Sequence, residues 1–309
     1  MSATILPNFL IIGAHKCGTT SLYEYLRQHP QVFMPQLKEP SFFTFENQNL
    51  DGFPAMKRSV VTRFEEYVAL FANADGKPAI GEASPMYFKC SHSAARIKHY
   101  LPNARLILIL RNPVERAYSH FQMELRNGTV KSQNFADAIQ EFELLPDGIR
   151  NQRYIHDGKY FSLLKPYLDL FGVENLLVLL FDQLRTDPTG MMRSVYQFLN
   201  IDSNFTPDLS EKHNEGGLWR NPLWKLYYRA VHPAFGSISN ALPENLQARL
   251  ASVNKQMRKK AVVRSPEMSP EVRAELHAIF REEILKLQDL IHQDLSAWLD
   301  AQPAPSANT

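Results

Sequence analysis

The residues FLIIGAHKCGTTSLYEYL, 9–26, form a pattern that could bind phosphate. An apolar run leads into a turn between Gly13 and Gly18, where glycine permits backbone geometry and close approach that other residues forbid. The usual loop for nucleoside triphosphates is G-x-x-x-x-G-K-[ST], with lysine directly after the second glycine. Here Thr19 holds that position, and the lysine is Lys16, inside the loop. The pattern predicts a phosphate ligand that is contacted by a lysine inside the loop, and not by one directly after the second glycine.

The start of the helix after this turn would supply the donors. The backbone amides of 16–21 would point at an anion at a helix N-terminus, where the helix dipole also favours negative charge. The candidate set is Lys16, Cys17, Gly18, Thr19, Thr20 and Ser21. The alternative interpretation is an ordinary strand–turn–helix corner that is capped by threonine and serine.

A second candidate lies where LILIL runs into Arg111 and the segment NPVERAYSH. Arg111 would sit at the carboxyl end of a strand, which is the ligand-binding edge of a parallel sheet. Ser119 follows about two helical turns after Pro113, on a face near Arg111, so a guanidinium fork and a hydroxyl could hold a second phosphate. In magnesium-dependent kinases and NTPases a second strand usually ends instead in an aspartate that holds the metal. The alternative is a surface arginine and a helix-face serine.

Strands and helices that alternate along the chain would position these residues. Continuous apolar strands separated by helices predict an α/β fold, with a P-loop-like central parallel sheet that helices cover on both faces. The expected strands are 8–12, 78–82, 105–110 and 175–181. The expected helices are 19–28, 60–73, 92–101, 113–126, 134–144, 160–171 and 188–199.

The C-terminal third has a different pattern. After Leu199 we expect no strand, a long loop over 201–222, and helices at 222–232, 243–262 and 269–299. A loop of that length inside a compact domain is usually functional or disordered. We expect a single domain over 1–300 and a disordered tail over 301–309.

The two phosphate motifs together resemble those of the sulfotransferase family, which uses 3′-phosphoadenosine 5′-phosphosulfate (PAPS). The resemblance covers residues 8 to about 200 and rests on Lys-x-Gly-Thr-Thr-Ser and Arg-Asn-Pro-x-x-Arg-x-x-Ser. It implies that residues 16–21 hold the 5′-phosphosulfate and that Arg111 and Ser119 hold the 3′-phosphate. It also implies that Lys16 sits against the bridging oxygen of the leaving phosphate, without a metal.

Further segments resemble the Golgi heparan-sulfate branch of the family. KEPSFF matches the segment whose glutamate is the proposed base, which is Glu39 here, although most glutamates are simply exposed. GEASPMYF, residues 81–88, resembles a strand end of that branch, but Ala83 stands where those enzymes have a functional lysine. Glu82 is a second candidate for the base, and His15 is a remote third. Tyr160 matches a family Gly-x-Tyr helix and would lie near the cofactor.

The loop over 201–222 lies where the family has a lid over the nucleotide. GGLWRN faintly resembles the lid motif of the cytosolic members, so Lys212 or Arg220 could reach the 3′-phosphate. A basic cluster further on is either a solvated helix face or a contact for anionic glycans or lipid head groups; it comprises Lys255, Arg258, Lys259, Lys260 and Arg264.

The whole-chain composition is that of a globular protein. Of 309 residues, 44% are hydrophobic and 21% are charged. The net charge of +2 argues neither for nor against a nucleic-acid partner, and we expect none. Two cysteines make no disulfide framework, no run has the length of a membrane span, and we expect a bacterial cytoplasmic protein. No cluster has metal-ligand spacing.

We therefore expect sulfuryl transfer from PAPS to a hydroxyl or amine, with 3′,5′-diphosphoadenosine (PAP) as product. The acceptor would be a glycan or glycolipid, or else a small metabolite. Two alternatives are a P-loop kinase of a small hydroxyl compound and a nucleotide-binding module that has lost catalysis.

Overall fold

The computed structural model describes residues 4–50, 60–144, 150–210, 218–221, 223–224, 253, 257, 261–263 and 267–300. Its centre is a five-stranded sheet in the order β2-β3-β1-β4-β7, and every pair of neighbours is parallel. The strands are β1 (Phe9–Gly13), β2 (Val32–Phe33), β3 (Ala79–Ala83), β4 (Arg105–Leu110) and β7 (Leu176–Leu180). The predicted α/β class with a central parallel sheet is confirmed.

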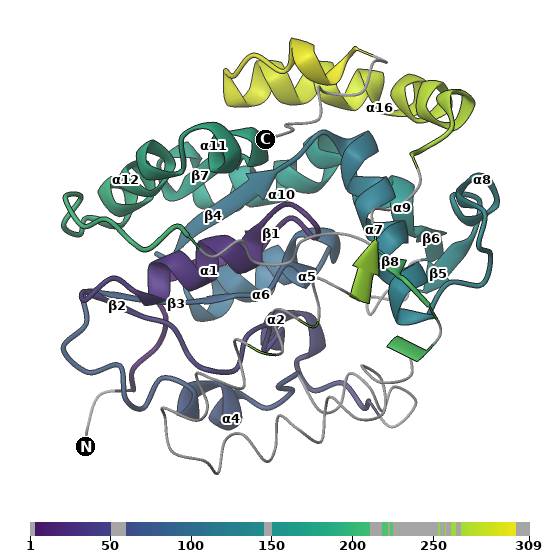
Figure 1. Cartoon of the computed structure of the whole chain (residues 1–309). Helices are drawn as coiled ribbons and strands as arrows, with labels where there is room; N and C mark the ends of the chain where they lie inside the picture. The colour runs from purple at the N-terminus through teal and green to yellow at the C-terminus, as the bar shows by residue number, and fades with distance from the viewer. Residues whose placement is uncertain are drawn as a thin grey trace.

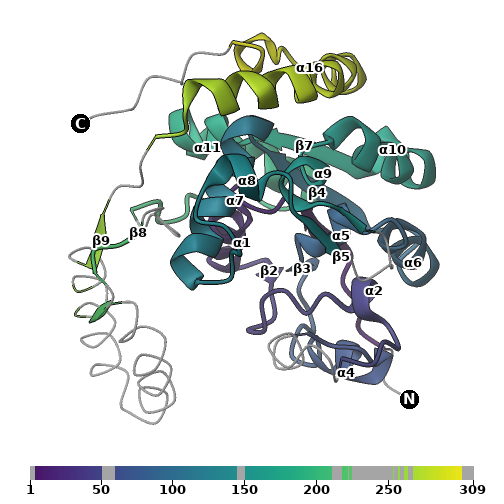
Figure 2. The ribbon, with the colours of Figure 1, turned by 90° about the vertical axis from the view of Figure 1, so that its right-hand side faces the viewer.

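Helices cover both faces of this sheet. The described helices are α1 (Thr19–Arg27), α2 (Phe42–Phe45), α4 (Phe64–Ala69), α5 (Met86–Lys89), α6 (Ser93–Tyr100), α7 (Pro113–Asn127), α8 (Phe135–Ala138), α9 (Arg153–His156), α10 (Tyr160–Phe171), α11 (Phe181–Thr186), α12 (Pro188–Leu199) and α16 (Pro270–Ile291). Helix α1 lies over one face, and α6 and α10 lie against the other (Figures 1 and 2). Helix α16 packs on α10 and α7 at the top of Figure 1.

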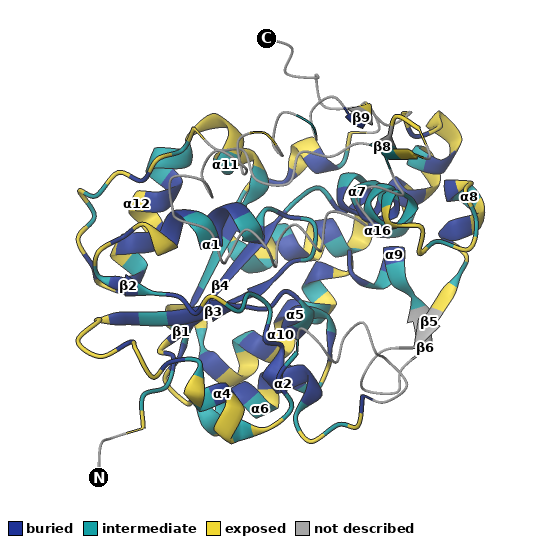
Figure 3. Cartoon of the chain, turned by 60° about the horizontal axis from the view of Figure 1, so that its bottom comes forward, coloured by how far each residue is buried: buried dark blue, intermediate teal, exposed yellow. Residues whose placement is uncertain are grey.

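The strands form the core because their side chains are apolar on both faces. Every residue of β1 is buried, and Leu106 to Leu110 of β4 are completely inaccessible. The central strands are accordingly dark blue in Figure 3. Burying each such side chain stabilises the fold by about 1.5–3 kcal/mol, so these strands hold the loops at their ends in fixed positions.

The carboxyl ends of β1, β3 and β4 meet at one edge of the sheet. The amide of Ala14 donates to the carbonyl of Ile109 at 2.8 Å, and the amide of Ser84 donates to the carbonyl of Ile11 at 3.0 Å. These bonds place the turn after β1 between the ends of its two neighbours. The edge therefore gathers residues from three distant parts of the chain.

Several predicted elements have the observed bounds because their ends carry local signals. Strand β4 and helices α10 and α12 match the prediction residue for residue. In α12, Asp187 accepts from the amide of Gly190 at 2.9 Å and Pro188 begins the helix. In α7, Asn112 caps and Pro113 begins the helix in the same way.

Other predicted helices were wrong because tertiary contacts override the local pattern. Helix 60–73 shrinks to α4, since the amide of Val61 donates to the carbonyl of Pro40 at 2.8 Å and keeps the preceding residues extended. Helix 134–144 shrinks to α8, since β5 (Phe142–Leu144) pairs antiparallel with β6 (Arg150–Gln152). The two-residue strand β2 was not predicted.

The prediction of no strand after Leu199 was also wrong. The short strands β8 (Leu218–Trp219) and β9 (Val262–Val263) pair antiparallel. Predicted helix 269–299 is α16, which ends where His292 turns left-handed with φ 53°, followed by the 3-10 turn η3 (Ser296–Trp298). Predicted helices 222–232 and 243–262 lie almost wholly outside the described residues, as does the tail 301–309.

Candidate active site

The turn after β1 has the geometry of an anion-binding loop. Gly18 precedes α1 with φ 98°, and a Cβ there would come within 2.9 Å of a methyl group of Leu184, so the position requires glycine. In this described segment no side chain caps α1, and its first turn has no acidic residue. The first amides of the helix therefore remain available to an anion. The amide of Cys17 differs from the prediction, because it donates to the carbonyl of Ala14 at 3.2 Å.

Lys16 occupies this loop in an unusual state. Its φ of 69° lies in the left-handed region, which few side chains other than glycine adopt. Burial, reinforced by the nearby cations of Arg126 and Arg111, lowers the pKa of Lys16 to about 8. A phosphate at this position would stabilise the charged form of Lys16 and reduce the repulsion among the three cations.

Arg111 stands where the sequence predicts, directly after β4 and about one quarter exposed. Its guanidinium lies 5.0 Å above the ring of Phe181 and 3.9 Å from a carboxylate oxygen of Glu115. Ser119 follows Glu115 by four residues in α7 and is partly exposed. Arg111, Glu115 and Ser119 therefore follow one stripe along the start of α7.

Tyr160 connects the two phosphate motifs from below. Its hydroxyl donates to the backbone carbonyl of Arg111 at 2.9 Å and lies 3.7 Å from the sulfur of Cys17. Only 1% of Tyr160 is exposed, and Cys17 is completely buried. Both side chains thus fix the floor of the site, while the predicted contact of Tyr160 with the cofactor stays a prediction.

A cavity of about 350 Å³ opens beside the loop and contains Glu39. Glu39 has φ 63°, its amide donates to the carbonyl of Ala83 at 3.1 Å, and its half-exposed carboxylate pairs with Lys38. The cavity is lined by His15, Lys38, Glu39, Ser41, Phe45, Val60, Pro85, Met86 and Lys89. The residue before Lys16 and the predicted base thus share one cavity.

Glu82 has a different environment. It is completely buried, and its carboxylate accepts hydrogen bonds from Tyr87 at 2.6 Å, Ser84 at 2.8 Å and Tyr67 at 3.3 Å. Burial raises the pKa of Glu82 to about 7, although the three hydroxyls oppose the shift. A carboxylate enclosed by donors cannot reach an acceptor in the cavity, so the geometry favours Glu39 over Glu82 as a base.

Two lysines that sequence reasoning did not assign to the site line this cavity. Ala83, which replaces the lysine of the family, is completely buried at the end of β3. Lys38 and Lys89 instead bring ammonium groups to the cavity from other positions. Lys38 could have been noticed beside Glu39, whereas no local signal marks Lys89. Phe42 and Phe43, which follow Glu39 in the same segment, are core residues.

A buried polar cluster lies beneath His15. The rings of His15 and His120 meet edge to face at 4.7 Å, and Asp157 lies 3.9 Å from His120. Burial lowers the pKa of His15 to about 3, so this side chain is neutral. Burial would raise the pKa of Asp157, but Lys89, His156 and Arg116 hold it below its usual range.

The same cluster contains a possible set of metal ligands. His15, His120 and Asp157 have ligand atoms within 4.8 Å of one another. However, Arg116 at 3.7 Å and Lys89 at 4.0 Å approach one oxygen of Asp157. These two cations already neutralise the carboxylate and would repel a divalent ion, so the arrangement suits an internal charge network better than a metal site.

The predicted lid is only partly described. Residues 201–210 are held against the end of α1, for example by Gln28, which donates to the carbonyl of Asp208 at 3.2 Å. Arg220 is exposed, and its amide donates to the carbonyl of Ala261 at 2.7 Å. Lys212 and the basic cluster of Lys255, Arg258, Lys259, Lys260 and Arg264 lie outside the described residues.

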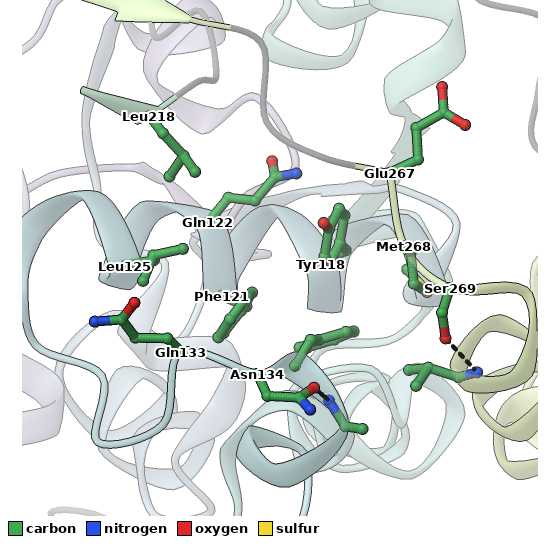
Figure 4. A pocket seen from close by; sticks show the side chains of 13 residues that line it. Tyr118, Phe121, Gln122, Leu125, Gln133, Asn134, Leu218, Glu267, Met268 and Ser269 are labelled. Carbon is green, nitrogen blue, oxygen red and sulfur yellow. Dashed lines mark hydrogen bonds between the residues drawn. The ribbon is translucent and has the colours of Figure 1, made fainter. Parts of the chain in front are cut away.

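Strand β8 lies over α7, the helix that carries Ser119. Figure 4 shows Leu218 above Gln122 and Leu125 of this helix, across a cavity of about 380 Å³. The lining is mainly apolar, and two of its polar residues cap helices: Asn134 caps α8, and Ser269 caps α16. None of the predicted site residues lines this second cavity.

Comparison with known proteins identifies the family. Residues 6–288 match the model of the sulfotransferase domain. The chain is 30% identical over 217 residues to human bifunctional heparan sulfate N-deacetylase/N-sulfotransferase 2, which covers 68% of this chain and 24% of that protein. It is 27% identical over 302 residues to mouse carbohydrate sulfotransferase 15, covering 78% of this chain and 53% of that protein. The chain thus spans only a quarter to a half of these relatives.

A solved structure agrees over nearly the whole chain. The sulfotransferase of Alicyclobacillus acidocaldarius is 30% identical, with a TM-score of 0.70, and the match covers 96% of this chain and 100% of that one. Within the described residues, no helix is both long and apolar enough to span a bilayer. On the family model, the identity and the shared fold, this chain belongs to the sulfotransferase family.

Proposed function

We propose that this chain transfers a sulfuryl group from PAPS to a hydroxyl or amine of an acceptor. One observation carries the proposal: a desolvated Lys16 at an uncapped helix start adjoins, through His15, a cavity that holds the carboxylate of Glu39. This arrangement offers a cationic side for a leaving phosphate and a basic side for an attacking group. The family makes PAPS the expected donor.

The residues on the cationic side fit the two phosphates of PAPS. We assign the 5′ end to Lys16, Gly18, Thr19, Thr20 and Ser21; Cys17 stays outside this set, because its side chain is buried and its amide donates to the carbonyl of Ala14. We assign the 3′-phosphate to Arg111 and Ser119, with Tyr160 below them and Lys212 or Arg220 from the lid. The nearness of Arg126 and Arg111 to the buried Lys16 supports this fit, since neighbouring cations favour a dianion. The assignment needs no metal.

When bound, PAPS supplies the sulfuryl group: its bond from sulfur to the bridging phosphate oxygen breaks, and that oxygen keeps the electron pair. A bond from sulfur to the acceptor oxygen or nitrogen forms. Lys16 stabilises the charge that develops on the phosphate. Glu39 accepts the proton that the acceptor loses, and the contact of its carboxylate with the Lys38 ammonium helps to fix its place in the cavity.

The acceptor side supports a glycan or glycolipid, with a small metabolite as the second choice. The relatives include heparan sulfate and carbohydrate sulfotransferases. The cavity combines carboxylate, ammonium and hydroxyl groups with the apolar side chains of Phe45, Val60, Pro85 and Met86, which suits a sugar ring that carries polar substituents. We further propose one catalytic domain over residues 1–300 and action in the cytoplasm, with no nucleic-acid partner.

Two measurements test the donor. PAP should raise the melting temperature equally in EDTA and in magnesium, because a ligand that binds only the folded state stabilises it by mass action. Labelled PAPS should give a product heavier by one sulfo group, whereas ATP with magnesium should give none. Turnover of ATP would favour a kinase, and PAP binding without any transfer would indicate an inactive binding module.

A panel of acceptors tests the second half of the proposal. Glucosamine oligosaccharides offer amines and hydroxyls, neutral glycans offer only hydroxyls, and simple phenols and alcohols represent metabolites. Mass gain on the glycans alone supports a carbohydrate acceptor. Mass gain confined to phenols or alcohols would contradict the glycan assignment while leaving sulfuryl transfer intact.

A further inference from the structure

We infer that Ser84 is a positioning residue. Its hydroxyl is held by the buried Glu82 and in turn holds the backbone of the segment that carries Glu39. The inference rests on the proposed role of Glu39 as the base. It concerns the segment from Glu39 to Ser41, which lies between β2 and α2 and belongs to neither. The starting observation is the conformation of that segment.

Two residues of the segment have strained backbone angles. Glu39 has φ 63° and Ser41 has φ 51°, both in the left-handed region. A residue other than glycine in such a region costs about 1–3 kcal/mol, and it persists only where the surroundings enforce it. Enforced strain at a proposed base indicates that the direction of its side chain matters.

Hydrogen bonds from the end of β3 supply this enforcement. The amide of Glu39 donates to the carbonyl of Ala83 at 3.1 Å, and the amide of Ser41 donates to the hydroxyl oxygen of Ser84 at 3.0 Å. The hydroxyl of Ser41 donates back to the carbonyl of Glu39 at 3.2 Å. Among these contacts, only the one to the hydroxyl of Ser84, the residue that follows β3, uses a side chain from outside the segment.

Glu82 determines how the Ser84 hydroxyl is oriented. The hydroxyl of Ser84 donates a hydrogen bond to the carboxylate of Glu82 at 2.8 Å. A lone pair of the hydroxyl oxygen is therefore free to accept from the amide of Ser41. Glu82 and Ser84 are both completely buried, so solvent cannot replace either bond. The chain Glu82–Ser84–Ser41 therefore runs from the rigid sheet to the segment that orients Glu39.

The three hydroxyls on Glu82 provide a matched comparison. Tyr67 also donates to Glu82, at 3.3 Å, but its ring packs on Phe42 and Phe43 of α2, which follow the segment from Glu39 to Ser41. Tyr67→Phe removes one hydroxyl from the same carboxylate and keeps that packing. Ser84→Ala removes one hydroxyl as well, together with the acceptor of the Ser41 amide.

The test measures sulfuryl transfer from labelled PAPS to a glucosamine tetrasaccharide, with release of free sulfate to water followed in the same samples. Ser84→Ala should lower the rate at saturating PAPS by roughly tenfold or more, because a small misplacement of a catalytic group is costly. PAP affinity should stay within about twofold of the parent. Tyr67→Phe should transfer at the parent rate. Ser84→Cys, of similar volume and with a weaker donor, should fall between them and serves if the alanine variant does not fold.

A double-mutant cycle separates positioning from a general loss of structure. In a Glu39→Gln background, Ser84→Ala should lower the rate by no more than about twofold further, since the group that it positions is already disabled. An equal loss in both backgrounds, or a loss in Tyr67→Phe as large as in Ser84→Ala, would overturn the inference. Ser84→Ala at the parent rate would overturn it too. Glu39→Gln at the parent rate would instead reject the base assignment itself.

Discussion

The nucleotide side and the acceptor side of this site are built in different ways. On the nucleotide side, consecutive residues 16–21 and one strand end with the helix after it supply the proposed contacts. On the acceptor side, the cavity is assembled from several separate parts of the chain: His15, then Lys38, Glu39 and Ser41, then Phe45 and Val60, and finally Pro85, Met86 and Lys89. A recurring ligand can be bound by a compact motif, whereas an acceptor cavity assembled from scattered residues can change one residue at a time.

The two sides also hold their key residues by different means. Lys16 lies in a turn that glycine geometry and the start of α1 define, and burial, together with neighbouring cations, lowers its pKa. Glu39 depends on hydrogen bonds from the end of β3. Variants on the nucleotide side should therefore alter affinity, with Lys16 altering turnover as well, and those on the acceptor side should alter turnover with little effect on nucleotide affinity.

The largest expected effect is that of Glu39→Gln, which keeps the shape of the side chain and removes the proton acceptor. Transfer should fall by roughly 10²–10⁴-fold, the usual contribution of a general base. PAP affinity, measured by calorimetry, should be unchanged. Glu65→Gln, on an exposed side chain of α4, is the matched control. A parent rate in Glu39→Gln would erase the contrast between the two sides.

The next effect is that of Arg111→Ala on the nucleotide side. PAP affinity should fall by about 10- to 150-fold, because a charged hydrogen-bonded contact contributes about 1.5–3 kcal/mol. Arg105→Ala, at the opposite end of the same strand, should leave affinity unchanged. Equal affinities of Arg111→Ala and the parent would contradict the assignment of the 3′-phosphate to this strand end.

A smaller effect concerns the pH dependence of PAP binding. Because burial and nearby cations lower the pKa of Lys16 to about 8, the free protein loses this positive charge above pH 8. Binding of an anion must then restore the proton, so the affinity should fall by up to about tenfold per pH unit from pH 8 upward. Lys16→Arg keeps its charge at these pH values and should give a flatter profile. A flat profile for the parent would show that the charge of Lys16 does not contribute.

The smallest effect concerns stability rather than function. Burial, with His15 nearby, lowers the pKa of His120 well below its usual value, so the unfolded chain takes up a proton below about pH 6.5 and the folded chain does not. Stability should therefore fall as the pH drops through 6.5, by up to about 1.4 kcal/mol per pH unit for this residue. Urea unfolding from pH 7.5 to 5.5 measures the slope. His120→Gln should flatten it, and identical slopes would contradict the assignment.

The sequence alone determined the features whose causes are local. Asparagine or aspartate before proline marked the starts of α7 and α12, and apolar runs marked the four main strands. Glycine spacing predicted the phosphate loop with Lys16, and Arg111 followed from its place after an apolar strand. These signals act within a few residues, so one sequence is enough to recognise them.

Only the tertiary structure decided the acceptor side. It separated Glu39, which opens to a cavity, from Glu82, which three hydroxyls enclose. It also brought Lys89 and Lys38 to that cavity. In place of the predicted helix 134–144, it showed the short helix α8 and the strand β5. The physical reason is that burial, desolvation and strand pairing depend on neighbours that are distant in sequence, and a local pattern of residues does not identify those neighbours.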